Sequence, residues 1–218
     1  MSRRAGGVAV LALRGRGDLP LAALHGRPLH LHALAALVAA GEDVVVAADP
    51  DQLATVRRQV ADAGLPATVS GGAAWWPQVE AMRPEGLLVH DPLCPLVSAD
   101  LIREVRRESG EASGSVAAVR PVTDTVKTAA DGVVGATLDR EGLAAVAAPV
   151  HVGAAVLRAA LAAGDEPPVH DLAVLVRWLG ARGDVRLHRA PSLARRVDDE
   201  TAVHLLECLD DLDRQTRH

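Results

Sequence analysis

The chain has 218 residues, 49% of them hydrophobic and 23% charged, and this balance allows one well-buried domain of mixed α/β type. Its net charge of −5, with arginines dispersed along the chain, argues against a nucleic-acid partner, which requires basic residues clustered on one face. The two cysteines lie far apart without metal-ligand spacing, so we expect a cytoplasmic protein. No apolar run approaches the ~18 residues of a membrane span, so we expect no membrane partner.

The first half of the chain alternates short apolar runs with segments of helical length. The runs predict strands at 8–13, 43–48, 67–70, 87–90 and 115–119, and the segments between them predict helices at 28–40, 49–63, 77–82 and 99–108. Because strand and helix alternate, we expect a doubly wound, three-layer sheet of mainly parallel strands.

The second half changes rhythm. The segments 126–128 and 133–138 flank Asp131-Gly132 and predict a β-hairpin, a candidate arm for pairing with a second subunit. Helices are expected at 152–163, 171–179 and 200–212, and a strand at 185–188. We therefore predict a single domain over 1–218 with a β-arm at roughly 122–150.

The run Leu87-Leu88-Val89-His90-Asp91 is the centre of the expected sheet. As a buried parallel strand it delivers His90 and Asp91 to the carboxyl edge, where open α/β sheets bind ligands. The Asp91 carboxylate is suited to a ribose hydroxyl or a magnesium-bound phosphate. It is equally suited to a simple Asx turn before Pro92.

A glycine-rich loop, Arg14-Gly15-Arg16-Gly17, follows the first expected strand. Its backbone N–H groups can cradle a phosphate, and its arginines add positive charge. The loop matches neither the Walker A motif nor the Gly-x-Gly-x-x-Gly pattern, and a solvated strand-to-helix turn is the alternative.

Other cations follow probable turns. Lys127, the only lysine of the chain, and Arg140 are candidate phosphate ligands, although a residue of this kind, taken alone, is more often a surface charge. Arg195-Arg196 is a candidate phosphate clamp or, alternatively, a pair attracted to the acidic helix start that begins at Asp198.

Taken together and in this order, these motifs resemble the 2-C-methyl-D-erythritol 4-phosphate cytidylyltransferase family over nearly the whole chain. The most specific are the His90-Asp91 strand end and the string 121–127 (Pro-Val-Thr-Asp-Thr-Val-Lys). The others are the glycine loop with Pro20, the string 26–29 (Gly-Arg-Pro-Leu), Gly71-Gly72, Pro95, Asp139-Arg140 with Leu143 and Pro149, and Arg195-Arg196.

The resemblance implies a Rossmann-like nucleotidyltransferase fold with a protruding β-arm, one cytidylyltransferase-like domain and a homodimer. It implies CTP as nucleotide, magnesium as cofactor and a small sugar-alcohol phosphate as second substrate. In this family the 4-phosphate of methylerythritol phosphate attacks the α-phosphate of CTP and releases pyrophosphate, a step of isoprenoid precursor synthesis by the non-mevalonate pathway. Such phosphoryl chemistry depends on positioning and on neutralising charge.

The resemblance also implies a role for individual residues. Arg16 and Arg195 correspond to catalytic cations, and Asp91 to a metal contact. The positions that correspond to nucleotide contacts are Ala12, Leu13, Gly15, Gly17, Gly71, Gly72, Gln78, His90 and Asp91. Those that correspond to contacts with the acceptor are Thr125, Lys127, Arg140 and Asp171.

Several positions depart from the family pattern. Leu21 follows Pro20 where the family has a lysine that binds the α-phosphate, and loss of one such cation corresponds to ~3–4 kcal/mol of transition-state stabilisation. Cys94 replaces an arginine, while Trp75 and Gln78 replace an arginine and a serine beside the cytosine. His170 replaces a threonine before Asp171.

Two functional hypotheses follow from these departures. In the first, the chain is a working cytidylyltransferase in which Arg14 or Arg16 of the shortened loop reaches the α-phosphate. In the second, it is a catalytically impaired paralogue that lacks the loop lysine and acts as a binding or regulatory subunit.

Overall fold

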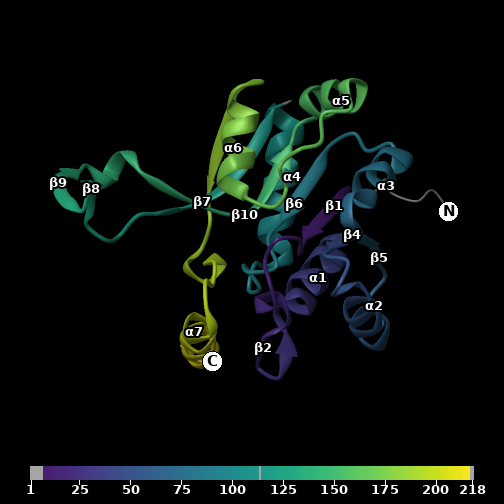
Figure 1. The fold of residues 1–218 in the computed structure, drawn as a ribbon, viewed down its shortest axis with the longest axis horizontal. Helices are drawn as coiled ribbons and strands as arrows, with labels where there is room; N and C mark the ends of the chain where they lie inside the picture. Colours follow the sequence, from purple (N-terminus) through teal and green to yellow (C-terminus); the bar gives the residue numbers. More distant parts are fainter. Residues whose placement is uncertain (1–6, 113, 217–218) are drawn as a thin grey trace.

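A computed structural model describes residues 7–112 and 114–216. Its core is a seven-stranded sheet in the order β11-β7-β10-β6-β1-β4-β5 (Figure 1). The strands in that order are Val185–Arg189, Ser115–Pro121, Ala144–Val152, Leu87–His90, Val8–Ala12, Asp43–Ala48 and Thr68–Gly71. The helices α1 to α7 are Leu29–Ala40, Leu53–Asp62, Trp75–Met82, Ala99–Ala112, Ala154–Ala163, Leu172–Gly180 and Glu200–Thr216.

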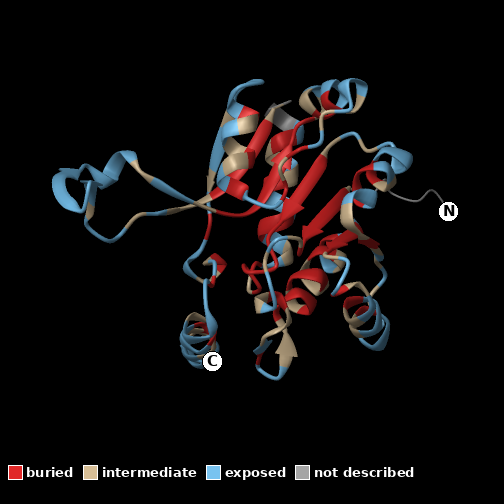
Figure 2. Ribbon diagram, in the orientation of Figure 1, coloured by how far each residue is buried: buried red, intermediate tan, exposed pale blue. Residues whose placement is uncertain are grey.

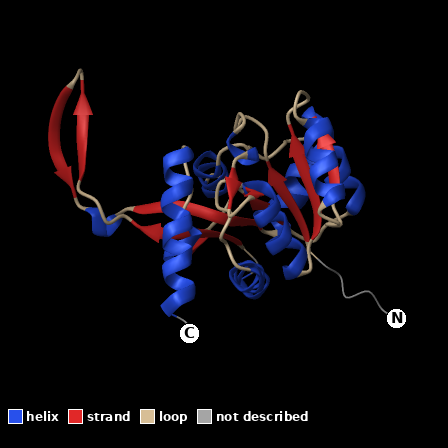
Figure 3. Cartoon of the chain, turned by 90° about the horizontal axis from the view of Figure 1, so that it is seen from below, coloured by secondary structure: helices blue, strands red, loops and turns tan. Residues whose placement is uncertain are grey.

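The sheet is parallel except at one strand. β1 pairs in parallel with β4 and β6, β4 with β5, and β11 with β7, whereas β10 runs antiparallel between β6 and β7. Helices lie on both faces of the sheet (Figure 3). The predicted three-layer α/β class with a mainly parallel sheet is therefore confirmed.

The core lies under the central strands. Every residue of β1 and β6 is buried, which explains why both read as uninterrupted apolar runs (Figure 2). α1 and α4 pack against each other beside these strands. α1 ends at Ala40, and its C-cap Gly41 has a φ of 87°, the left-handed conformation that glycine commonly adopts at this position.

β10 was not predicted. We expected a helix to begin at residue 152, but Val152 is the last residue of β10 and α5 begins at Ala154. The alanine-rich strand contains Pro149, and its pairing with β7 is irregular between Val146 and Val150. Proline within a run argues against a central strand, so local sequence could not reveal this one.

The predicted hairpin is present and projects from the body as an arm (Figures 1 and 3). β8 (Val126–Ala130) and β9 (Val133–Leu138) form a separate two-stranded sheet around Asp131-Gly132. The arm is shorter than the predicted 122–150, because the chain returns to the main sheet as β10. Val133 is 69% and Val134 67% exposed.

A second hairpin, also not predicted, connects the first half of the chain to its C-terminal helix. β2 (Ala23–Leu24) and β3 (Arg27–Pro28) pair around His25-Gly26, whose φ angles of 49° and 73° suit a two-residue hairpin turn. The backbone N–H of His25 donates to Glu207 of α7 at 2.6 Å. A small apolar cluster, which includes Leu24 and Leu206, packs between this hairpin and α7.

Within the described residues, no helix is long and apolar enough to cross a membrane.

Candidate nucleotide site

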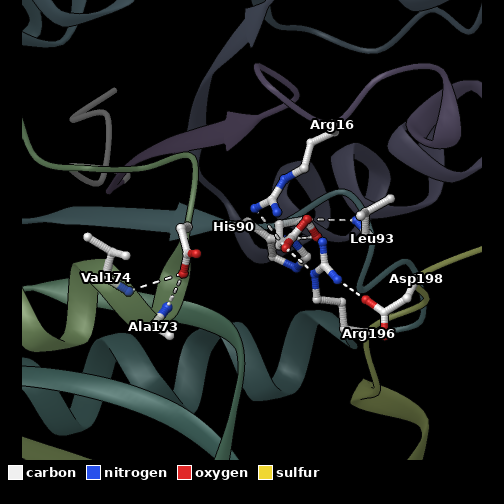
Figure 4. A network of polar contacts seen from close by, with 9 residues as sticks. Arg16, His90, Leu93, Ala173, Val174, Arg196 and Asp198 are labelled. Atoms are coloured by element: carbon white, nitrogen blue, oxygen red, sulfur yellow. Dashed lines mark hydrogen bonds and ion pairs between the residues drawn. The ribbon is translucent and has the colours of Figure 1, made fainter. Parts of the chain in front are cut away.

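Asp91 is the centre of the candidate site. β6 delivers it to the carboxyl edge of the sheet, where it is only 1% exposed. One carboxylate oxygen accepts from the backbone N–H of Leu93 at 3.0 Å, which forms the Asx turn considered above. The other lies 2.8 Å from Nη2 of Arg16 and 3.0 Å from Nε of Arg196 (Figure 4). Asp91 therefore both makes the turn and holds two guanidinium groups.

The two arginines differ in their surroundings. The Arg16 side chain is 9% exposed, and burial lowers its pKa while the charge of Asp91 acts in the opposite direction. Its buried Nε has no hydrogen-bond partner among the described residues. Arg196 is more open and also contacts Asp198. Asp91 and Asp198 together balance the charges of Arg16 and Arg196, so an anionic ligand would bind here by replacing a carboxylate as the partner of a guanidinium group.

Arg195, predicted as a catalytic cation, takes a different place from its neighbour. It follows the short 3₁₀ turn Ser192–Ala194 with extended angles, φ −75° and ψ 146°, so successive side chains point to opposite sides. Its positive charge acts on Arg120, whose pKa is lowered first by burial and then by Arg195. The arginine that contacts Asp91 is Arg196. The sequence analysis named Arg196 as a member of the Arg195-Arg196 pair but assigned the catalytic role to Arg195.

His90 is fully buried and does not face the site as a cation. Its Nδ1 lies 2.9 Å from the backbone oxygen of Asp91. Burial lowers its pKa to about 4, against the opposing charge of Asp91, so the ring is neutral near pH 7. Its predicted nucleotide contact would have to come through the backbone of this strand end.

The glycine loop is fixed from the neighbouring strand. The backbone N–H of Gly15 donates to Asp49 Oδ2 at 2.8 Å, and Gln52 Nε2 donates to the carbonyl of Gly17 at 2.9 Å. Gly15 and Gly17 have φ angles of 71° and 56°, the left-handed region that glycine adopts at little cost. Asp49 and Gln52 were missed, although both follow β4 at the same edge of the sheet.

The remaining predicted nucleotide positions lie at three places: the end of β1, the pair Gly71-Gly72 at the end of β5, and α3. Ala12 and Leu13 are fully buried at the end of β1, so only their backbone is available to a ligand. At the end of β5, a Cβ on Gly71 would lie 2.9 Å from a methyl carbon of Leu53, so the backbone there approaches α2 closely. Gln78 is half-buried.

Trp75 and Trp76 begin α3 directly after the glycine pair. Trp75 is fully buried and Trp76 is 8% exposed, with ring centroids 5.4 Å apart. Both indoles are part of the core. As placed, neither presents an open ring face on which a base can stack.

The predicted acceptor residues are divided between two places. Asp171 caps α6 by accepting from the N–H groups of Ala173 and Val174 at 2.8 and 3.1 Å (Figure 4). The hydrogen bond from Val174 is the main cause of its lowered pKa, and the charge of Arg16 also contributes. Asp171 therefore belongs to the same edge as Arg16.

Thr125, Lys127 and Arg140 are exposed on or beside the arm. Lys127 Nζ lies 3.0 Å from Thr137 Oγ1, and Arg140 Nη1 donates to the carbonyl of Thr123 at 2.7 Å. Within one chain the structure does not bring these three side chains to Asp91.

A resident magnesium site is not evident. In the part of the chain that the structure describes, no group of three or more His, Cys, Asp or Glu side chains is placed to hold a metal ion. Both Asp91 oxygens are already engaged, so a metal contact there would require one arginine to leave. The residues do not fit a protein-held cation, whereas a nucleotide triphosphate carries magnesium on its own oxygens.

The seven-stranded sheet, with a glycine loop after its first strand and arginines at its carboxyl edge, has the Rossmann-like nucleotidyltransferase fold. Residues 16–190 match the family described as IspD: 2-C-methyl-D-erythritol 4-phosphate cytidylyltransferase. The match covers more than half of the chain, and the chain belongs to this family. The resemblance drawn from the motifs is thereby confirmed.

Individual relatives agree with this assignment. The chain is 39% identical over 139 residues to the bifunctional enzyme IspD/IspF of Solidesulfovibrio magneticus. The aligned region covers 57% of this chain and 35% of that relative. The chain is 41% identical over 88 residues to the 2-C-methyl-D-erythritol 4-phosphate cytidylyltransferase of Symbiobacterium thermophilum, with 37% of each chain covered. The chain thus spans little more than a third of the length of these relatives.

Solved structures show the same fold. The 2-C-methyl-D-erythritol 4-phosphate cytidylyltransferase of Thermus thermophilus superimposes with a TM-score of 0.71 and 28% identity, over 94% of this chain and 98% of that one. The 4-diphosphocytidyl-2C-methyl-D-erythritol synthase of Anaerococcus prevotii gives a TM-score of 0.74 over 94% and 99% of the two chains. Its identity of 14% supports the fold alone.

Proposed function

We propose that the chain transfers CMP from CTP to 2-C-methyl-D-erythritol 4-phosphate and releases pyrophosphate. The observation that carries the proposal is the cluster of Arg16, Asp91 and Arg196 beside the glycine loop. An acceptor phosphate oxygen forms a new bond to the α-phosphorus, and the bond from that phosphorus to the bridging oxygen breaks. Pyrophosphate leaves with the electron pair of the broken bond, so no protein base is required.

The chain contributes position and charge to this reaction. The glycine loop lies directly after β1 with Gly17 in a left-handed conformation, and Arg16 and Arg196 offset negative charge that develops around the α-phosphate. Asp91 holds both guanidinium groups in place before the nucleotide arrives. Magnesium carried by the triphosphate of CTP would neutralise part of its charge, and no residue of the chain is assigned to hold it.

A homodimer completes the proposed site. Thr125, Lys127 and Arg140 belong to or flank the arm, which projects away from the body (Figure 1), and a second copy is the simplest source of an arm over each site. The exposed Val133 and Val134 give the arm apolar surface for such an interface. The cytoplasmic location expected from the two unpaired cysteines belongs to the same proposal.

Pyrophosphate release from CTP, magnesium and methylerythritol phosphate tests the function. We expect turnover by the native chain and a loss of at least about tenfold in Arg16→Ala, since removing one preorganised donor costs on the order of 10²–10³ in rate. Arg186→Ala is the matched control, because Arg186 is an exposed arginine on β11. Equal rates in all three proteins would exclude the role of Arg16.

The impaired paralogue is the second candidate, and Leu21 is the observation that favours it. Lys127 is the only lysine in the chain and lies on the arm, so the family's loop lysine has no lysine substitute near Pro20. CTP binding measured by calorimetry without pyrophosphate release would support this candidate. Turnover comparable to that of a lysine-containing family member would exclude it.

A further inference from the structure

Glu166 links three segments at the edge of the candidate site. It lies in the connection between α5 and α6, five residues before Asp171. Its Oε1 accepts a hydrogen bond from Nε1 of Trp75 at 2.9 Å, and the same oxygen lies 3.7 Å from Nη1 of Arg14. One carboxylate oxygen therefore joins the glycine loop to α3 and to the connection that carries Asp171.

The contact with Trp75 has a clear structural reason. Trp75 is fully buried, and a buried indole N–H without an acceptor is costly, so its Nε1 requires a partner. A neutral acceptor of the same shape would satisfy this requirement. The negative charge of Glu166 is therefore not explained by Trp75.

The contact with Arg14 explains the charge. Arg14 begins the loop in which Gly15 and Gly17 adopt left-handed angles, and such a loop has many accessible conformations unless it is held. Asp49 and Gln52 hold the loop from the side of β4. Glu166 attracts Arg14 toward α3 and the α5–α6 connection, and so restrains the loop from another direction.

We propose that Glu166 is a positioning residue that fixes the glycine loop through Arg14 and so prepares its backbone for the triphosphate. The second half of this statement rests on the proposed function. Glu166 acts through Arg14 and does not itself touch the nucleotide. Its substitution therefore alters loop order in the free protein and nucleotide affinity in the complex.

Glu166→Gln separates the two contacts. Glutamine keeps an oxygen that accepts from Trp75 but loses the charge that attracts Arg14. Asp165→Asn is the matched control, because the adjacent Asp165 forms an ion pair with Arg182 at 2.6 Å and, among the described residues, makes no hydrogen bond or ion pair with the loop. If Glu166 serves only Trp75, the Gln variant behaves like the native chain.

Hydrogen exchange of the backbone amides over residues 13–18, measured without nucleotide, tests the positioning role independently of any activity. We expect faster exchange in Glu166→Gln than in the native chain and in Asp165→Asn, with an unchanged melting temperature. Exchange equal to that of the native chain overturns the proposal. If Glu166→Gln proves unstable, Arg14→Gln removes the same charge pair and must give the same faster exchange.

Titration with CTP and magnesium tests the link to the nucleotide. We expect Glu166→Gln to raise the dissociation constant threefold to fivefold, the range that corresponds to a partly exposed ion pair of up to about 1 kcal/mol. Unchanged or tighter binding overturns the link. If the native chain binds no CTP, the proposed function fails, while the exchange experiment still decides whether Glu166 orders the loop.

Discussion

Replacing Asp91 with asparagine tests the charge cluster most directly. Asparagine keeps the size of the side chain and an oxygen for the N–H of Leu93, but it removes the charge that faces Arg16 and Arg196. Removing one partner of a buried ion pair costs about 3–5 kcal/mol, because the remaining charge stays buried without compensation. Arg196 is 37% exposed, so water screens it in part and we expect the lower end, about 3 kcal/mol.

Thermal unfolding measures this loss. In a chain of this length 1 kcal/mol corresponds to about 2–4 °C, so the Asn variant should melt roughly 6–12 °C below the native protein. Inorganic phosphate should restore more of the melting temperature in the variant than in the native chain, because Arg16 has then lost its carboxylate partner and Arg196 keeps only Asp198. Asp165→Asn, which breaks a half-exposed pair, is the control and should shift the melting temperature far less. A fall of under about 2 °C for Asp91→Asn would refute the buried cluster.

Three further predictions concern other parts of the molecule. Arg196→Ala should reduce pyrophosphate release more than Arg195→Ala, because only the former guanidinium contacts Asp91 in this structure; equal effects in a parallel rate assay would contradict this. Burial lowers the pKa of His151 to about 4, below the ordinary value of about 6.5 that it has in the unfolded chain. Between these two pH values the unfolded chain binds more protons than the folded chain, so the free energy of unfolding decreases as the pH falls. Urea midpoints at pH 7 and pH 4.5 should therefore differ less in His151→Gln than in the native chain. Val133→Asp with Val134→Asp should convert a dimer to monomers in analytical ultracentrifugation, because two charges would be placed on the exposed arm surface; a persistent dimer would exclude that surface as the interface.

The parallel half of the fold was predictable because its strands are buried on both faces. β1, β4 and β6 read as short apolar runs between helices, and this pattern constrains their order in the sheet. β10 could not be recognised in the same way. It pairs with β6, far away in the sequence, and its alanines and Pro149 give no strand signal of their own.

The strand end at Asp91 was predictable for the same reason, since a buried parallel strand must deliver its last residues to the carboxyl edge. The side chains that surround it were not. Arg195 and Arg196 are neighbours of equal charge, and only the extended backbone after the 3₁₀ turn determines which of them reaches Asp91. Glu166 lies in a connection without periodic pattern, and its partners are 91 and 152 residues earlier in the chain. The sequence thus determines where the charged edge forms, whereas the tertiary packing determines which of its charges meet.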